Sequence, residues 1–551
     1  MKTLALLVSF TISLAGCSPA DQPVTEAANR PNILLIAVDD MGYSDVGPFG
    51  SEIKTPSIDS LAKKGVKLTN FYVGPSCSPT RSMLFSGNDN HVAGLGNMNE
   101  LLTPNQVGQP GYEGFLNDRV VSVASVLRDA GYHTYMAGKW HLGHEPDQDP
   151  SKRGFERVFT MLHGGTSHFD DEWMMYASYT PTYREDGVRT HVPQGFYSTE
   201  FYANQIVKYM DEQEDDRPFF AYLSLTAPHD PLHVPDEWLD RNKGRYNDGY
   251  NALRTSRLAR MKELGIVPDE ADLGPWLKLI PQWEKLTAEQ KKMEIRRMEI
   301  YSAMIENIDH HIGRVLQYLE SSGKTKDTLV VFFSDNGANG FEMDSYPGTD
   351  EAWVEHNSDN RFSNWGKRGS RIAQGPGWAQ ASSTPFHLYK NFLAEGGIRS
   401  PLIISGPGVA HQGETVDSVA HVMDLAPTFL DLAGATYPAT YNDKPVEQPR
   451  GKSMVPLLSK KSSTVHGPDE AIGWEYNNLK AIRIGDYKAT WIVKPFGPSE
   501  WQVFDLSVDP GESKDLSSQN PNLKQRLIDA WDEYAKSVGV VPPEGGFPAT
   551  K

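Results

Sequence analysis

The chain has 551 residues, which is enough for one large domain and a smaller second one. Its formal net charge of −18 at pH 7 argues against nucleic acid and against an anionic membrane surface as partners. An acidic protein can bind an anionic substrate only where a metal ion or a few basic side chains create a local positive centre.

The N-terminus has the composition of a targeting segment. Lys2 precedes an apolar run, Leu4 to Ala15, that is too short to span a bilayer as a stable helix. The run ends in Leu14-Ala15-Gly16-Cys17, which is similar to the box of bacterial lipoprotein signals. We therefore expect a lipoprotein signal peptide over residues 1–16, a lipid on Cys17 that anchors the protein to a membrane, and a flexible tether over residues 17–29. The alternative is an ordinary secretory signal; either way we expect export to the periplasm or cell envelope.

Two continuous apolar runs rich in branched side chains predict strands that are buried on both faces. The first, Asn32 to Val38, ends in Asp39-Asp40, and the second, Leu329 to Phe333, ends in Ser334-Asp335-Asn336-Gly337. Adjacent carboxylates at the end of a buried strand repel each other and need a cation. The alternative for Asp39-Asp40 is a solvated pair in a loop.

A third predicted strand, Val66 to Val73, leads into Gly74-Pro75-Ser76-Cys77-Ser78-Pro79-Thr80-Arg81-Ser82. A lone cysteine is usually a small buried apolar residue. Pro79, however, suits the first turn of a helix, so that Cys77 would lie near a helix N-terminus, where an anion is favoured. Arg81 adds a permanent cation that can bind an oxyanion through two hydrogen bonds. This stretch therefore indicates an anion site with a reactive side chain at its centre.

Basic side chains follow two further predicted strands. The strand Tyr132 to Ala137 leads to Gly138-Lys139-Trp140-His141, where Lys139 and His141 could point to one side if the chain stays extended. The strand Phe219 to Leu225 leads to Ala227-Pro228-His229. Lys139 or His141 alone is more often a surface residue or a satisfied histidine, but both together at a strand end between glycines favour a site. Lys390 lies in a glycine-rich segment, residues 339–397, of the kind that often surrounds a site.

The order of elements predicts an α/β fold. Buried strands alternate with helices, of which Met298 to Leu319 is the clearest, and this alternation predicts a large mostly parallel sheet sandwiched by helices over residues 30–445. Residues 231–290 show no clear periodic spacing of apolar residues, so we expect an insertion or lid there. Short antiparallel strands and a closing helix then predict a smaller C-terminal α+β domain over residues 446–551. In such folds ligands bind at the carboxyl ends of the strands, where most of these polar residues fall.

The oxygen-bearing residues at the strand ends suit one hard cation, with calcium favoured over magnesium. They are Asp39, Asp40, Asp335 and Asn336. If oxygen atoms hold the metal, the histidines are free for proton transfer.

The order Cys77-Ser78-Pro79-Thr80-Arg81 resembles the Cys-x-Pro-x-Arg signature of the type I sulfatases, and the chain looks nearest to the bacterial arylsulfatases. In that family a formylglycine-generating or sulfatase-maturing enzyme converts the cysteine to formylglycine, an aldehyde whose hydrate is the nucleophile. The strings Ala137 to Gly143 and Ser334 to Gly337 are also close to the family pattern. The resemblance extends from Pro31 to about Leu432, with a weaker match, Phe504-Asp505-Leu506 with Asp509-Pro510, in the smaller domain.

The resemblance implies hydrolysis of a small-molecule or saccharide sulfate monoester with one calcium ion. By resemblance the calcium ligands are Asp39, Asp40, Asp335, Asn336 and modified Cys77. Arg81 would polarise the hydrate, and Lys139 and Lys390 would grip the sulfate oxygens. His141 would help to break down the covalent sulfate hemiacetal. His229, with Lys390, would protonate the leaving alcohol, and Asp335 would also accept a proton from the attacking hydroxyl.

Two alternative functions stay open at this point. One is a phosphomonoesterase or phosphonate monoester hydrolase on the same superfamily scaffold. Dinuclear zinc relatives of that kind use extra His and Asp ligands and usually a Ser or Thr nucleophile, so Cys77 with Pro79 and Arg81 argues against them. The other is a lipid-anchored, calcium-dependent binding protein without catalysis. Under any of these functions, selectivity is expected in the irregular segments near residues 145–200, 231–290 and 340–385.

Overall fold

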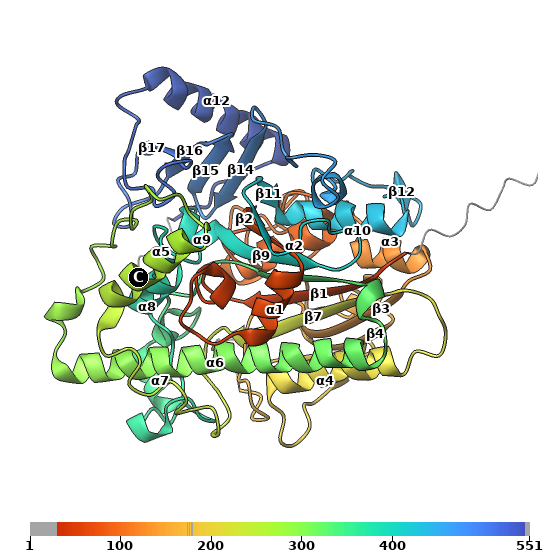
Figure 1. Ribbon diagram of the computed structural model, residues 1–551, viewed down its shortest axis with the longest axis horizontal. Helices are drawn as coiled ribbons and strands as arrows, with labels where there is room; N and C mark the ends of the chain where they lie inside the picture. Colours follow the sequence, from red (N-terminus) through yellow and green to blue (C-terminus); the bar gives the residue numbers. More distant parts are fainter. Residues whose placement is uncertain (1–29, 174, 176, 178–179, 546–551) are drawn as a thin grey trace, which may run out of the picture.

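The computed structural model describes residues 30–173, 175, 177 and 180–545. The expected signal peptide over residues 1–16, the tether over residues 17–29 and the lipid on Cys17 lie outside the described residues. Within the part of the chain that is described, no helix is long and apolar enough to cross a membrane. An eleven-stranded sheet carries most of the fold, and the C-terminal part of the chain contributes a four-stranded sheet (Figure 1).

The centre of the large sheet is parallel. Its five central strands lie in the order β8 (Thr328–Ser334), β1 (Asn32–Asp39), β7 (Phe219–Pro228), β3 (His133–Lys139) and β4 (Arg157–Met161). Antiparallel neighbours extend it on both sides. They comprise β9 (Arg399–Ser405) and β2 (Val66–Tyr72) beyond β8, and β5 (Tyr183–Glu185) and β6 (Val188–Thr190) beyond β4. The short strands β10 (Glu414–Val416) and β11 (Ala420–His421) pair parallel with β2. This is the large, mostly parallel sheet that the sequence predicts.

Helices cover both faces of this sheet (Figure 1). One face packs against α1 (Pro56–Lys64), α4 (Ser198–Asp211) and α6 (Ala288–Ser321). The other face packs against α2 (Cys77–Ser86), α3 (Val123–Asp129) and α10 (Leu425–Ala433). Strand β1 shows the cause, because Leu34 and Ile36 contact the first group of helices, and Ile33 and Leu35 the second. A strand that is covered on both sides must be apolar throughout.

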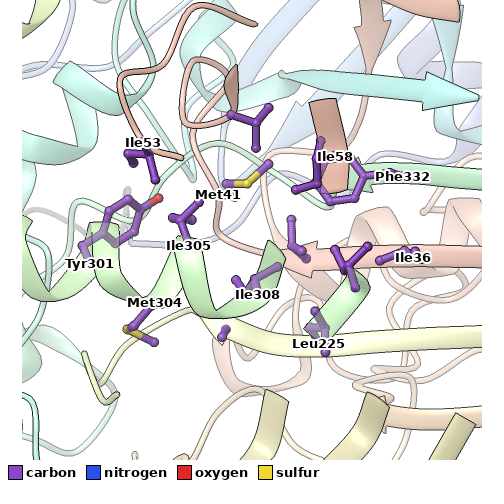
Figure 2. Packing of buried hydrophobic residues seen from close by; sticks show 14 of the residues in the cluster. Ile36, Met41, Ile53, Ile58, Leu225, Tyr301, Met304, Ile305, Ile308 and Phe332 are labelled. Carbon is purple, nitrogen blue, oxygen red and sulfur yellow. The ribbon is translucent and has the colours of Figure 1, made fainter. Parts of the chain in front are cut away.

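The long helix α6 packs its apolar stripe on the ends of the central strands. Ile305 and Ile308 belong to the same buried cluster as Ile36 of β1 and Phe332 of β8 (Figure 2). The helix begins at Ala288, well before the predicted Met298, because Thr287 forms a capping box at its start. Its first turns are largely exposed and carry no apolar stripe. The spacing of apolar residues therefore predicts only the buried part of the helix.

The segment over residues 231–290 contains a regular helix that the sequence does not predict, α5 (Gly249–Glu263). Its buried face includes Arg257, whose guanidinium lies 2.6 Å from Asp45 Oδ1 and 2.8 Å from Glu52 Oε2. A charged residue at a buried position hides the apolar period of such a helix. The remaining short elements are α7 (Glu351–His356), α8 (Pro376–Ser382), α9 (Glu395–Ile398), α11 (Val455–Leu458), β12 (Thr440–Tyr441) and β13 (Lys444–Pro445).

The C-terminal part is built on an antiparallel sheet, as the sequence predicts. Its strands follow in sequence order and are β14 (Ala471–Tyr476), β15 (Leu479–Ile484), β16 (Tyr487–Trp491) and β17 (Trp501–Asp505). The closing helix α12 (Pro521–Val538) packs on this sheet through Leu527 and Trp531. The hairpin between β14 and β15 turns at Asn477-Asn478, whose φ angles of 49° and 67° match a two-residue turn of type I′.

A buried histidine joins the C-terminal sheet to the large domain. His91 Nδ1 lies 2.8 Å from Asp89 Oδ1, and His91 Nε2 lies 3.1 Å from Glu475 Oε2 of β14. Burial alone would lower the pKa of His91, but Asp89 and Glu475 raise that pKa to about 9. His91 is therefore a charged link between two carboxylates at pH 7.

We expect His91→Gln to lower the free energy of unfolding at pH 7 by about 2–3 kcal/mol. Because the pKa of His91 is raised in the folded protein, its contribution is complete below its ordinary pKa of about 6.5 and is lost as the pH rises through about 9. Urea unfolding of both proteins between about pH 6 and pH 10 should show the difference shrinking. His356→Gln, at an exposed position of α7, is the control. A difference that stays constant with pH would contradict this account.

Candidate active site

The carboxyl ends of four adjacent parallel strands form the floor of the site. Asp39 ends β1, Lys139 ends β3, and His229 and Asp335 directly follow β7 and β8. Since the strand order is β8-β1-β7-β3, these residues meet at one edge of the sheet. The loop after β2 brings Cys77 to the same edge.

A compact group of polar atoms lies at this edge. Asp39, Asp40, Cys77 and His229 each offer a ligand atom, and these atoms all lie within 4.8 Å of one another. The Cys77 sulfur is 3.2 Å from Asp39 Oδ1 and 3.8 Å from Asp40 Oδ1. Asp40 has a left-handed backbone with φ of 66°, and such conformations gather at functional sites.

Asp335 and Asn336 complete the predicted set of oxygen ligands. The Asp40 backbone N–H donates to Asp335 Oδ1 at 3.2 Å, and Asn336 Nδ2 donates to Asp40 Oδ1 at 2.6 Å. The Asn336 Oδ1 atom is buried without a hydrogen-bond partner among the described residues. An orphaned carbonyl oxygen beside three carboxylates fits a hard cation such as calcium.

Buried cations neutralise the carboxylates. Lys139 Nζ lies 2.7 Å from Asp39 Oδ2, and Lys390 Nζ lies 2.7 Å from Asp40 Oδ2. Burial alone would raise the pKa of Asp39, but the Lys139 ammonium and the other cations around it hold that pKa well below its usual range. The sequence-predicted lysines therefore flank the cluster.

Arg81 extends from α2 into the cluster, and all three nitrogen atoms of its guanidinium donate hydrogen bonds. Its Nε and Nη2 atoms donate to Asp335 Oδ2 at 3.0 and 2.8 Å, and its Nη1 donates to the Lys139 carbonyl and to Ser224 Oγ. The close approach of β3 and β7 beneath it requires Gly138, because a Cβ there would lie 1.7 Å from the Ser224 carbonyl oxygen. Arg81 therefore has one fixed orientation in the site.

Cys77 begins helix α2, so its side chain lies at a helix N-terminus as the sequence predicts. The Lys390 ammonium lies 3.4 Å from its sulfur. Burial and the neighbouring Asp39 raise the pKa of the Cys77 thiol well above its usual range. The encoded thiol is thus neutral at pH 7 and a weak nucleophile.

The side chains of His141 and Lys139 point to different parts of the site, whereas an extended chain would have directed both to one side. The backbone of His141 is left-handed, with φ of 57°, so the chain is not extended at this point. Its Nε2 atom lies 2.9 Å from Glu100 Oε1, while the Lys139 ammonium contacts Asp39.

Burial lowers the pKa of His141 and that of His229 to about 4 each. Both imidazoles are therefore neutral at pH 7.

Glu100 is a site residue that the sequence analysis missed. It lies in a single turn of 3-10 helix, Asn99–Leu101, which follows no strand and has no apolar period. The sequence therefore contains no local signal for its place beside His141.

A cavity of about 620 Å³ opens over the cluster. Cys77, His141, His229 and Lys390 line it. The described lining further includes Met98, Glu100, Leu101, Gly164, Asn391, Asn477 and much of the segment over residues 341–351. Part of the segment near 340–385, where selectivity is expected, therefore forms a wall, whereas no lining residue comes from 231–290. Another cavity, of about 790 Å³, is lined by none of the predicted site residues.

Residues 31–435 match the profile of the family described as Sulfatase. The chain belongs to the sulfatase family. Residues 386–534 also match the profile of the N-sulphoglucosamine sulphohydrolase C-terminal region. An arylsulfatase of Klebsiella aerogenes is 42% identical over 464 residues, covering 84% of this sulfatase and 98% of the relative. An uncharacterised sulfatase of Schizosaccharomyces pombe is 41% identical and covers 95% of this chain and 96% of its own.

Solved structures agree with this assignment at the level of the fold. Ps i-CgsB in complex with k-i-k-neocarrahexaose superposes with a TM-score of 0.64 at 24% identity, covering 92% of this sulfatase and 93% of that chain. BT4656 in complex with its substrate D-glucosamine-2-N,6-O-disulfate gives a TM-score of 0.60 at 21% identity, covering 93% and 98%. The family assigns the reaction class, so this sulfatase is a sulfuric ester hydrolase.

Proposed function

We propose that this sulfatase hydrolyses aryl sulfates and similar monosulfated small molecules, using a formylglycine made from Cys77 and one calcium ion. The observation that carries the proposal is the placement of Cys77. It begins a helix, lies against Asp39 and Asp40, and has the ammonium of Lys390 beside its sulfur. The 42% identity to an arylsulfatase supports the aryl class.

Asp39, Asp40, Asp335 and Asn336 would hold the calcium ion through oxygen atoms. The buried Asn336 Oδ1, which has no other partner among the described residues, supports this assignment. The bound ion would supply positive charge to the sulfate group and to the oxygen that attacks it.

The lysines and Arg81 would bind and orient the substrate. The ammonium group of Lys139 lies on the Asp39 carboxylate and that of Lys390 on the Asp40 carboxylate, and a sulfate between the two lysines would accept hydrogen bonds from both. Arg81 would fix the hydroxyl groups of residue 77 through its guanidinium. These buried cations are fixed before substrate arrives, and preorganised charge of this kind stabilises a transition state effectively.

His229 would protonate the leaving oxygen. Its Nδ1 lies 2.8 Å from the Asp230 carbonyl oxygen, to which it donates, and this contact leaves Nε2 for the cavity side. Nε2 lies 3.3 Å from Asp40 Oδ2, next to Lys390. Because the neutral ring carries its proton on Nδ1, Nε2 would first take up a second proton, and the resulting imidazolium would pass that proton from Nε2 to the bridging oxygen as the S–O bond breaks.

Formylglycine would explain why a cysteine is encoded here. Its hydrate supplies two hydroxyls on one carbon, one to attack sulfur and a second whose deprotonation releases sulfate, so that water need not attack sulfur. A serine in this place has only one hydroxyl and would retain the sulfate as an ester.

The cavity walls favour a monosulfated aromatic or apolar leaving group. Phe341 and Tyr346 line one side, and Met98 and Leu101 add apolar surface. The exposed charged residues of the wall segment are all acidic, namely Asp344, Asp350 and Glu351. Apart from Lys390 at the base, no lysine or arginine is found in the described lining. A second sulfate at this rim would face carboxylates, which disfavours polysulfated glycans.

Peptide mass spectrometry across residue 77 is the direct test of the proposal. We expect the aldehyde at this position in active protein and its absence in Cys77→Ser, which should lose multiple turnover on an aryl sulfate. Assay of the matching aryl phosphate separates the phosphomonoesterase alternative. Unmodified Cys77 in fully active protein, or faster turnover of the phosphate, would exclude the proposed chemistry.

Calcium should stabilise the folded protein through the four oxygen ligands. At about 100 times its dissociation constant it should add about 2.7 kcal/mol to the free energy of unfolding, seen as a higher melting temperature. Chelation should abolish activity, and calcium should restore it. Asn336→Leu should lose the calcium-dependent shift, whereas Asn357→Leu, on the exposed end of α7, should keep it. An equal shift in both variants would place the ion elsewhere.

The acidic rim can be tested with two lysine variants of one helix. Glu351 and Glu355 are both exposed on α7, but only Glu351 lines the cavity. Glu351→Lys should raise kcat/KM for a disulfated saccharide relative to a monosulfated aryl ester by about five-fold at low salt, and added salt should reduce the effect. Glu355→Lys should change the ratio little. Equal changes in both variants would show that the rim has no specific influence.

A further inference from the structure

The cavity contains a histidine–carboxylate pair that the proposed roles do not yet explain. His141 Nε2 and Glu100 Oε1 are 2.9 Å apart, and each side chain is only 3% exposed. Both residues line the cavity beside Cys77. We propose that Glu100 is a positioning residue, which binds the Nε2–H of His141 and thereby leaves Nδ1 as the proton acceptor of the site.

The contact fixes the tautomer because an ionised carboxylate can only accept hydrogen bonds. His141 holds the pKa of Glu100 well below its usual range, although burial opposes this. Glu100 is therefore ionised, and the proton of the neutral His141 ring must lie on Nε2. The Nδ1 atom is buried and has no hydrogen-bond partner among the described residues. A bare, buried Nδ1 in a catalytic cavity is available to take a proton.

Several contacts hold Glu100 in place. Its 3-10 turn is closed by the Leu101 N–H, which donates to the Met98 carbonyl at 2.9 Å. Asn97 Nδ2 donates to the Leu101 carbonyl at 2.9 Å and to Asn477 Oδ1 at 2.8 Å. The turn is thus tied to the β14–β15 hairpin, so the carboxylate cannot easily leave the imidazole.

The other titratable groups around the pair are Lys139, His144, His163 and Tyr476. The Lys139 ammonium disfavours a second positive charge on His141 and lies on the carboxylate of Asp39 instead. Burial lowers the pKa of His144 and lowers that of His163 to about 3. Glu100 is therefore the one carboxylate among the described neighbours whose hydrogen bond reaches the His141 ring.

The His141–Glu100 pair would act in the step that releases sulfate from residue 77, and this role rests on the proposed function. The remaining hydroxyl of residue 77 would lose its proton to His141 Nδ1 while its oxygen forms a double bond to carbon. The bond from that carbon to the sulfate oxygen breaks, and sulfate leaves with the electron pair. Glu100 would stabilise the resulting imidazolium, as a buried carboxylate does in a catalytic triad.

The tautomer can be measured without the formylglycine. Protein with ¹⁵N-labelled histidine, produced with Cys77 unmodified, should give an Nε2-protonated signal that His141→Gln removes. In Glu100→Gln the amide can donate as well as accept, so the signal should shift towards the other tautomer. In Glu100→Asp the carboxylate remains, and the Nε2-protonated form should be kept. An unchanged His141 signal in Glu100→Gln would overturn the inference.

Kinetics of the matured protein provide the second readout. Glu100→Gln should lower kcat for an aryl sulfate by about 100-fold with KM changed less than about three-fold, because His141 acts after binding. Phenol release in the first turnover should stay fast, giving a burst. Glu100→Asp should recover part of kcat. Glu113→Gln, which alters a glutamate of the same loop outside the cavity, should match the parent.

The outcomes separate this inference from the proposed function. Parent protein without sulfatase activity would refute the proposed function, while the ¹⁵N measurement would still decide the role of Glu100. Active parent protein with an equal kcat in Glu100→Gln would refute the role of Glu100 alone. Equal loss of first-turnover rate, kcat and melting temperature in both Glu100 variants would show a purely structural role and would also refute it.

Discussion

The repulsion between three buried carboxylates is the constraint on which this structure depends. Asp39, Asp40 and Asp335 meet at the ends of two neighbouring strands, where burial destabilises the ionised form of each carboxyl group. Three cations from distant parts of the chain, Lys139, Lys390 and Arg81, offset that charge. Replacing such a cluster with apolar residues often increases stability. Under the proposed function, a calcium ion and a sulfate group would use this concentrated charge.

The charges of the cavity change from base to rim. Lys390 lies at the base against the Asp40 carboxylate, the neutral histidines His141 and His229 line the cavity beside it, and the rim carries exposed acids. A single anionic group is attracted only when it enters deeply, since the acids at the mouth repel it. Under the proposed function, such an order of charges would favour a substrate whose sulfate enters first and whose remaining atoms are uncharged.

The sequence predicted the parts of the site that follow buried strands. An apolar run such as Asn32 to Val38 determines both a central strand and the place of Asp39 at its end, because parallel strands finish at a common edge. Glu100 and Asn477 could not be found in this way. One lies in an isolated turn and the other at a hairpin tip, and only the packing of distant segments brings them to the cavity. Helix α5 was missed for a related reason, since Arg257 occupies its buried face.

The hairpin tip at Asn477 has an evolutionary consequence. It belongs to the C-terminal sheet, yet it lines the cavity and is bonded to Asn97 of the large domain. The two parts of the chain therefore cannot diverge independently, because a new hairpin sequence alters the shape of the pocket as well as the domain junction. Recombination that exchanged the C-terminal sheet between family members would transfer a piece of the cavity wall along with it, while the carboxylate cluster and residue 77 stayed unchanged.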